Sequence, residues 1–173
     1  MDSKAPLSAV LLAKLTEQVE RADHLISLVP AGKLDWRPET AAGAISIGEL
    51  LGHFLECLAG FCAALYALHP GPLRHFGSLR ELPVNHFCQV DEARRRIAEY
   101  MSHIKEGFAQ VTDDDLKRPI ETVFVPEGEA ALAILLGNLE HLINHKYQLF
   151  FYLKLLGVPV ATRDLYQLRG RVP

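Results

Sequence analysis

The sequence predicts an all-α protein: an antiparallel four-helix bundle with a long irregular connection between its second and third helices. Four segments carry apolar residues at three-and-four spacing, which is typical of helices with a buried face. Glycine and proline interrupt the chain between them, and no segment shows the alternation of a strand. The length of 173 residues suits one domain, so we expect residues 1–173 to form a single bundle domain.

The first helix is predicted from Pro6 to Val29, because apolar residues recur every three or four positions along it. Pro6 suits the first position of a helix, and the Pro-Ala-Gly run at 30–32 ends it. The loop that follows has no sustained period. We expect its Trp36, the only tryptophan, to pack the loop onto the bundle.

The second helix is predicted to begin after Ser46. Ser46 and Glu49 form a capping-box pattern just before an apolar run that extends to Leu68. The segment 69–90 is rich in proline, glycine, histidine and asparagine. It is therefore predicted to be the longest irregular stretch of the chain.

The third helix is predicted over 91–111, with a short extra turn at 112–116 and a brief extended connection at 119–126. The fourth and longest helix is predicted over 128–156. Gly157 stands at the usual terminating position after it, and the helix is so apolar that we expect it to be buried on most sides.

The composition is that of a soluble globular protein, with 49% hydrophobic and 23% charged residues. Eighteen basic residues against 21 acidic ones give a formal charge of -3, which argues against a nucleic-acid-binding protein. Asp2 precedes the single early Lys4, unlike the basic start of a secretory signal. The apolar region 130–160 holds too many polar groups for a membrane span. We expect a cytoplasmic protein that binds neither nucleic acid nor membrane.

The three cysteines show no CxxC spacing, which argues against a disulfide framework or a thiolate zinc site. Cys57 lies one turn from His53, but no basic residue flanks it. We therefore interpret Cys57 as a small core residue rather than a nucleophile.

A polar stripe interrupts the apolar surface of the fourth helix. Its members are spaced three, four, three and four residues apart: Asn138, His141, His145, Gln148 and Tyr152. His141 and His145 project from one face, where a single divalent ion can bind both rings. The alternative is a buried hydrogen-bond network in which each polar group has a partner.

His53 is the candidate third ligand, because it lies at the edge of the apolar stripe of the second helix. If the second helix packs against the fourth, three imidazoles converge. Three nitrogen donors suit Zn²⁺, Ni²⁺, Fe²⁺ or Co²⁺ and leave coordination positions open, as in catalytic sites.

Two further sets of residues are candidates around these rings. Asn138, Gln148 and Glu49 are candidates to orient the imidazoles through the second ring nitrogen, and each of them also suits an ordinary polar network. The general base is not assigned: Glu49 is the first candidate, with Glu56 and Tyr152 as alternatives.

The remaining five histidines are expected to lie at the surface. They are His69, His75 and His86 in the irregular stretch, and His24 and His103 near the ends of helices.

Three segments in order carry a resemblance to a known family: LVPAGKLDWRPE, AISIGELLGHFLE and NLEHLINHKYQLFFYLKLLGVPV. Together they resemble the DinB/YfiT superfamily of four-helix metalloenzymes, over nearly the whole chain. The resemblance places the family's metal triad on His53, His141 and His145. It also shows two departures, since Lys146 and Tyr147 stand where the family often has Arg and Gly.

The resemblance implies a divalent metal ion, most often zinc or nickel, and a homodimer. It also implies a low-molecular-weight thiol as cosubstrate in some members. The first hypothesis is therefore a metal-dependent thiol S-transferase or hydrolase, which activates a thiol or water for attack on a small electrophilic substrate. That substrate is expected to enter where the helix ends meet the connection between Leu68 and Val90. The alternative is a non-catalytic, dimeric, stress-associated metal-binding bundle, and a third reading is a metal-free histidine network.

Overall fold

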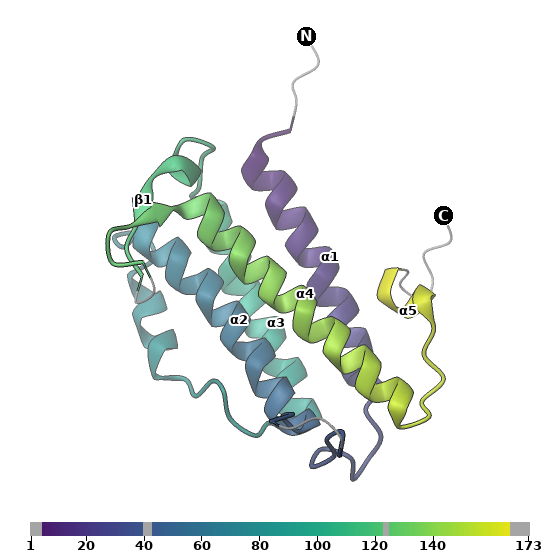
Figure 1. Cartoon of the computed structure of the whole chain (residues 1–173). Helices are drawn as coiled ribbons and strands as arrows, with labels where there is room; N and C mark the ends of the chain where they lie inside the picture. Colours follow the sequence, from purple (N-terminus) through teal and green to yellow (C-terminus); the bar gives the residue numbers. More distant parts are fainter. Residues whose placement is uncertain (1–4, 40–42, 123–124, 167–173) are drawn as a thin grey trace.

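The computed structural model describes residues 5–39, 43–122 and 125–166. Four long helices dominate it (Figure 1): α1 Leu7–Ser27, α2 Ile47–Leu68, α3 Val90–Phe108 and α4 Ala131–Leu155. The shorter elements are the α-helix α5 Thr162–Tyr166, the 3₁₀ helices η1 Arg74–Glu81 and η2 Asp115–Lys117, and an antiparallel pair of two-residue strands, β1 Pro119–Ile120 and β2 Glu129–Ala130. The predicted all-α fold is confirmed.

The helices of the bundle run in two directions. α2 packs against α3 and α4, and so does α1, so α1 and α2 lie diagonally across the bundle. The amides of Asn85 and Cys88 donate to the carbonyls of Gly52 and Gly48, so α3 begins beside the first turns of α2. Neighbours are therefore antiparallel in the α2/α4 and α1/α3 pairs and parallel in the α2/α3 and α1/α4 pairs (Figure 1). The long connection between α2 and α3 makes the parallel pair possible, because it carries the chain back along α2.

That connection is less irregular than predicted, because it contains η1. Phe76 and Leu79, three residues apart in η1, are buried and share one face of the 3₁₀ helix. Further along, the backbone of His86 lies directly against α2 at Gly52. A Cβ added to Gly52 would come within 2.0 Å of the His86 carbonyl oxygen, so only glycine permits this approach.

The helix ends follow the sequence signals closely. The capping box of α2 is present: the Ser46 hydroxyl accepts from the Glu49 amide, and the Glu49 carboxylate accepts from the Ser46 amide. α4 is followed by Gly157 with a φ of 77°. Pro6 precedes the first helical residue rather than occupying it, and the α1 amides of Leu7 and Ser8 donate to the Asp113 carboxylate. Asp113 belongs to a segment far along the chain, so the sequence around the start of α1 does not predict this cap.

Trp36 packs the loop between α1 and α2 onto the bundle, as predicted. Its ring meets the Tyr152 ring edge-on, with centroids 5.3 Å apart. The carbonyls of Leu34 and Trp36 also accept hydrogen bonds from the amides of Gly48 and Ile47 at the start of α2. The loop is therefore fixed beside the end of α4 that carries Tyr152.

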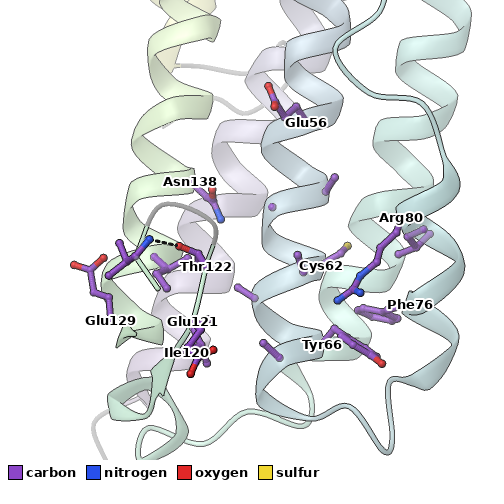
Figure 2. A pocket seen from close by; sticks show the side chains of 18 of the residues that line it. Glu56, Cys62, Tyr66, Phe76, Arg80, Ile120, Glu121, Thr122, Glu129 and Asn138 are labelled. Atoms are coloured by element: carbon purple, nitrogen blue, oxygen red, sulfur yellow. Dashed lines mark hydrogen bonds between the residues drawn. The ribbon is translucent and has the colours of Figure 1, made fainter. Parts of the chain in front are cut away.

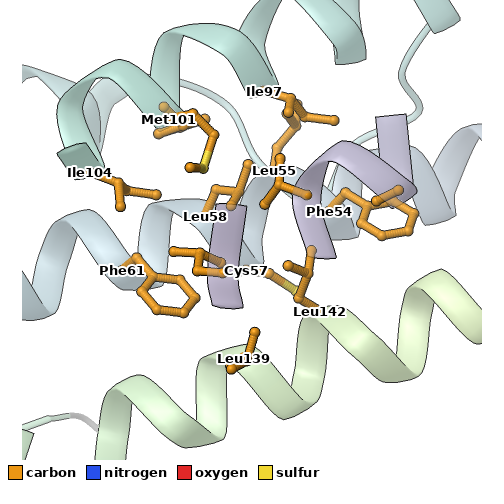
Figure 3. Close-up of a cluster of buried hydrophobic side chains, with 14 of the residues drawn as sticks. Phe54, Leu55, Cys57, Leu58, Phe61, Ile97, Met101, Ile104, Leu139 and Leu142 are labelled. Atoms are coloured by element: carbon orange, nitrogen blue, oxygen red, sulfur yellow. The ribbon is translucent and has the colours of Figure 1, made fainter. Parts of the chain in front are cut away.

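The core lies where α2 meets α3 and α4 (Figure 3). Among the described residues, α2 is the one helix long and apolar enough to cross a membrane. Its most apolar 18-residue window has a mean hydropathy of 1.6, and 61% of that window is buried inside the bundle. The expectation that α4 is buried on most sides is wrong. One stripe of α4 is exposed, namely Leu136, Tyr147, Phe151 and Leu155, with exposed fractions of 47%, 45%, 51% and 64%. α4 lies at the outside of the bundle, so only part of its circumference meets other helices.

Candidate metal centre

Three histidines from two helices converge on one point, as the sequence predicts. α2 contributes His53, and α4 contributes His141 and His145. One potential ligand atom from each ring lies within 4.8 Å of the other two. The Nε2 atoms of His141 and His145 are 2.8 Å apart, and the His53 ring stacks on that of His145 with centroids 5.0 Å apart. The antiparallel packing of α2 on α4 brings these residues together, because the first third of α2 faces the middle of α4.

Hydrogen bonds fix which nitrogen of two rings faces the centre. His53 Nδ1 is 3.1 Å from the carboxylate of Glu56, and His145 Nδ1 is 3.0 Å from the side-chain oxygen of Gln148. Each acceptor favours the tautomer with its proton on Nδ1, which leaves Nε2 with a free lone pair. Metal-binding histidines are oriented by such partners in the same way.

The charge state and spacing of the rings suit a divalent cation. Burial lowers the pKa of His145, and the neighbouring His141 and His53 rings lower it further, so the neutral form that binds metal is favoured. Two nitrogens bound to one ion at 2.0–2.1 Å lie about 2.9–3.4 Å apart in octahedral or tetrahedral geometry. The separation of 2.8 Å between the two Nε2 atoms of α4 is close to that range. The residues present therefore fit the implied metal.

The other predicted site residues divide into two groups. Gln148 contacts His145, and its amide also donates to the Tyr152 hydroxyl at 2.9 Å. Glu49 does not reach a histidine: its carboxylate caps α2, hydrogen bonds from the Ser46 amide and hydroxyl lower its pKa, and Arg37 is 3.8 Å away. Of the two roles considered for Glu49, the structure therefore shows the ordinary polar one, because the capping box holds its side chain at the start of the helix.

Glu56 takes the role that sequence reasoning gave to Glu49. The signal was available, since Glu56 follows His53 by three residues on the same helix face. Asn138 instead lies over α2, next to Gly60. A Cβ added to Gly60 would be 2.9 Å from the Asn138 side-chain oxygen, so the glycine makes room for the amide.

A groove of about 1060 Å³ leads away from the histidines along the outer face of α2. Figure 2 shows Glu56 near one end and Tyr66 and Ile120 toward the other. Its floor is made of small α2 residues, and its walls come from η1 and from the β1/β2 segment with α4; His141 also lines it. At the η1 wall the Arg80 guanidinium stacks over the Tyr66 ring, 5.1 Å from its centroid. The centre is therefore open to a space large enough for a small molecule.

A family model describing the DinB superfamily matches residues 14–149. The chain belongs to the DinB superfamily. The fold is also similar to the crystal structure of a DinB-like protein from Bacillus subtilis, with a TM-score of 0.64 at 18% identity, over 85% of this chain and 92% of that chain. Among proteins with curated descriptions, none matches the chain significantly.

Two residues distinguish this DinB chain from the pattern that the resemblance implied. Lys146 is buried between α1 and α4, where its ammonium donates to the side-chain oxygen of Gln18 at 2.6 Å. Tyr147 lies on the exposed stripe of α4, and its ring contacts that of Phe151 with centroids 5.5 Å apart. Both departures therefore affect helix packing and the outer surface rather than the histidines.

The remaining histidines are less exposed than expected. Among them only His75 is exposed, and the others are half-buried beside carboxylates: His24 with Asp164, His69 with Asp115, His86 with Glu92 and His103 with Glu106. Their acidic partners lie on other elements or on an adjacent turn, which the histidine positions alone do not reveal.

The cysteines behave as core residues, as predicted for Cys57. All three are free and buried. Burial, the largest effect, raises the pKa of Cys57 to about 12, so its thiol is not a nucleophile at neutral pH.

Proposed function

We propose that this DinB-superfamily chain is a metal-dependent enzyme. Its three histidines would hold a divalent cation, zinc or nickel, and it would transfer a low-molecular-weight thiol to a small electrophilic substrate or hydrolyse that substrate. The observation that carries the proposal is the convergence of His53, His141 and His145 beside an open groove.

The donor set supports a catalytic rather than a closed structural metal. Within the described residues, the cluster holds three donors from histidine and no fourth protein ligand. Catalytic sites characteristically keep such a position free. A cation bound there lowers the pKa of a coordinating thiol or water, so that the nucleophile is available at neutral pH. Glu56 and Gln148 keep the rings oriented for that purpose.

Glu56 is the proposed proton acceptor. Its carboxylate contacts His53 Nδ1 and also lines the groove, so it borders both the ring and the space that is open to a substrate. An acceptor within reach of the nucleophile can take the proton that a thiol or water releases. Glu49 is excluded from this role by its place in the capping box.

The groove supports the proposed class of substrate. Ala59 and Ala63 leave room for an apolar body, and Arg80 on the η1 wall offers a positive charge to an anionic group. Because η1 belongs to the connection after Leu68, this arrangement also supports the expected entry route.

The experiment uses untagged protein. We expect about one tightly bound divalent ion per chain and conjugation of a simple thiol to a reactive electrophile. Replacing His145→Ala removes one of three ligands, so we expect loss of the metal and at least a hundredfold fall in kcat/KM with the helical circular-dichroism spectrum retained. The matched control is His69→Gln, which replaces a half-buried histidine outside the cluster. This variant should keep the bound metal and the wild-type kcat/KM.

Two outcomes would contradict the proposal. A stoichiometric metal without turnover of thiol, ester or amide substrates would favour the non-catalytic bundle. If the protein binds no metal and its melting temperature does not change with added Zn²⁺ or chelator, the hydrogen-bonded histidine network is favoured.

We also propose that the chain forms a homodimer through the exposed stripe of α4. Leu136, Tyr147, Phe151 and Leu155 lie along one side of that helix, and large exposed apolar surfaces of this kind are typical of protein interfaces. The stripe is distinct from the groove lining, so a second copy could cover it without closing the groove.

A further inference from the structure

A second group of potential metal ligands lies where η1 meets α3, apart from the three histidines on α2 and α4. η1 contributes His75, and α3 contributes His103 and Glu106. One ligand atom from each lies within 4.8 Å of the others. The Glu106 carboxylate is 3.1 Å from His75 Nε2 and 3.8 Å from His103 Nδ1. Donors bound to one tetrahedral ion at about 2.1 Å lie about 3.4 Å apart, so both distances are close to those of a loaded site.

Phe76 holds the two imidazoles in place. Its ring is 3% exposed and meets the His75 ring edge-on at 4.9 Å and the His103 ring at 5.2 Å between centroids. A buried aromatic side chain is fixed by its surroundings, so it limits the rotation of both rings. The two imidazoles are therefore preorganised around the carboxylate.

The charges around the group favour a cation. Within the described residues, the ion pairs of Glu106 involve only His75 and His103, so no lysine or arginine neutralises its carboxylate. One carboxylate facing two imidazoles carries a negative charge that a divalent ion can offset. All three side chains remain at least partly exposed, so an ion can reach them from solvent.

A third cluster, formed by His86, Cys88 and Glu92, shows why such proximity alone is insufficient. There the Arg96 guanidinium lies 3.8 Å from Glu92 and supplies the positive charge itself. Burial raises the pKa of the Cys88 thiol to about 12, and thiolate is the form that binds metal. The carboxylate of that cluster therefore already has a cationic partner.

We propose that His75, His103 and Glu106 form a second divalent-cation site, suited to Zn²⁺ by its two nitrogen donors and one oxygen donor. A cation there bridges η1 and α3. It therefore stabilises the wall of the groove that carries Leu79 and Arg80, without touching the first centre. The site would act on the shape of the groove and not on the chemistry beside His141.

The test measures metal stoichiometry and proteolysis, not activity. We expect the wild-type chain to bind two equivalents of Zn²⁺ by calorimetry, and His103→Gln to bind one. Trypsin cleaves after Arg74 and Arg80, within η1. At Zn²⁺ about tenfold above the Kd of this site, opening of η1 and therefore cleavage at these residues should slow about tenfold. The protection should be lost in His103→Gln.

Two controls separate this site from the first centre. His69→Gln, a half-buried histidine that belongs to neither cluster, should keep both equivalents and the protection of η1. His141→Ala should lose one equivalent but keep the protection, whatever becomes of the proposed enzyme activity. The second site is overturned if His103→Gln still binds two equivalents, or if Zn²⁺ leaves cleavage after Arg74 and Arg80 unchanged in the wild-type chain.

Discussion

Lys146 is a lysine with 4% of its surface exposed, and Gln18 is the partner of its ammonium. Removing an ammonium from water is costly, and burial lowers the pKa of Lys146 to about 8, with Arg21 adding to the effect. At pH 7 Lys146 is therefore still mostly charged, in a place where an apolar side chain of similar size would make the folded state more stable. The polar contact joins α4 to α1 at some cost in stability.

This burial predicts an unusual dependence of stability on pH. Between pH 8 and the ordinary pKa of lysine, the unfolded chain binds a proton that folded Lys146 has lost, so the contribution of Lys146 to the free energy of unfolding should rise with pH. Replacing the pair together, with Lys146→Met and Gln18→Leu, should raise the free energy of unfolding by about 1–3 kcal/mol at pH 7 and remove the lysine's contribution. The advantage of the double variant over the wild type should therefore shrink toward pH 10. Urea denaturation at pH 7 and at about pH 10 measures both effects. The exposed Lys14→Met is the control, and equal pH profiles for the wild type and the double variant would refute the account.

At Gly52, α2 lies directly against the backbone of the connection to α3. The backbone at His86 occupies the space that a side chain would need, and the amide of Asn85 donates to the Gly52 carbonyl. This contact anchors the end of the α2–α3 connection and thereby sets where α3 begins. A glycine in the middle of a helix normally lowers helix stability, so its presence here reflects packing.

We therefore expect Gly52→Ala to lower the free energy of unfolding by about 1–3 kcal/mol, because the added methyl group displaces a backbone segment. Gly137→Ala is the matched control. Gly137 is also helical, but a Cβ there meets nothing within 4 Å, so alanine should raise stability by about 0.5–1 kcal/mol. Denaturant midpoints measure the stability change of each variant. If Gly52→Ala raised stability, the backbone at His86 would have to move aside without cost, which would contradict this account.

The molecule as a whole exposes apolar side chains on one flank of α4 while burying most of α2. Two aromatic members of the stripe contact each other, since the Tyr147 and Phe151 rings lie 5.5 Å apart, and Tyr147 also rests on the buried Phe150 ring at 5.9 Å. A second copy of the chain would remove this surface from water, which is the main driving force of association.

If the homodimer forms there, Phe151→Glu should reduce the mass in solution from twice 19.3 kDa to 19.3 kDa, because a carboxylate would be buried against apolar groups. Light scattering after gel filtration measures the mass in solution. Arg95→Glu on the exposed surface of α3 is the control and should leave the dimer intact. A wild-type chain of 19.3 kDa at all concentrations would refute the dimer.

Apolar spacing, capping and terminating residues act over a few positions, so they were enough to predict the four long helices and most of their ends. Ser46 with Glu49, and Gly157 after α4, are examples that the structure confirms. The sequence also determined that His141 and His145 share a face, since four residues make about one helical turn. The 3₁₀ helix η1 has weaker local signals and was missed.

Which distant groups meet follows from packing between elements and not from the pattern of any one segment. The parallel course of α2 and α3, the Asp113 cap of α1 and the exposed flank of α4 depend on how the elements pack. So does the choice of Glu56 over Glu49 beside His53, and so does the meeting of His75 with His103. The physical reason is that contacts between elements depend on crossing positions and side-chain rotamers. Periodicity along one segment constrains neither.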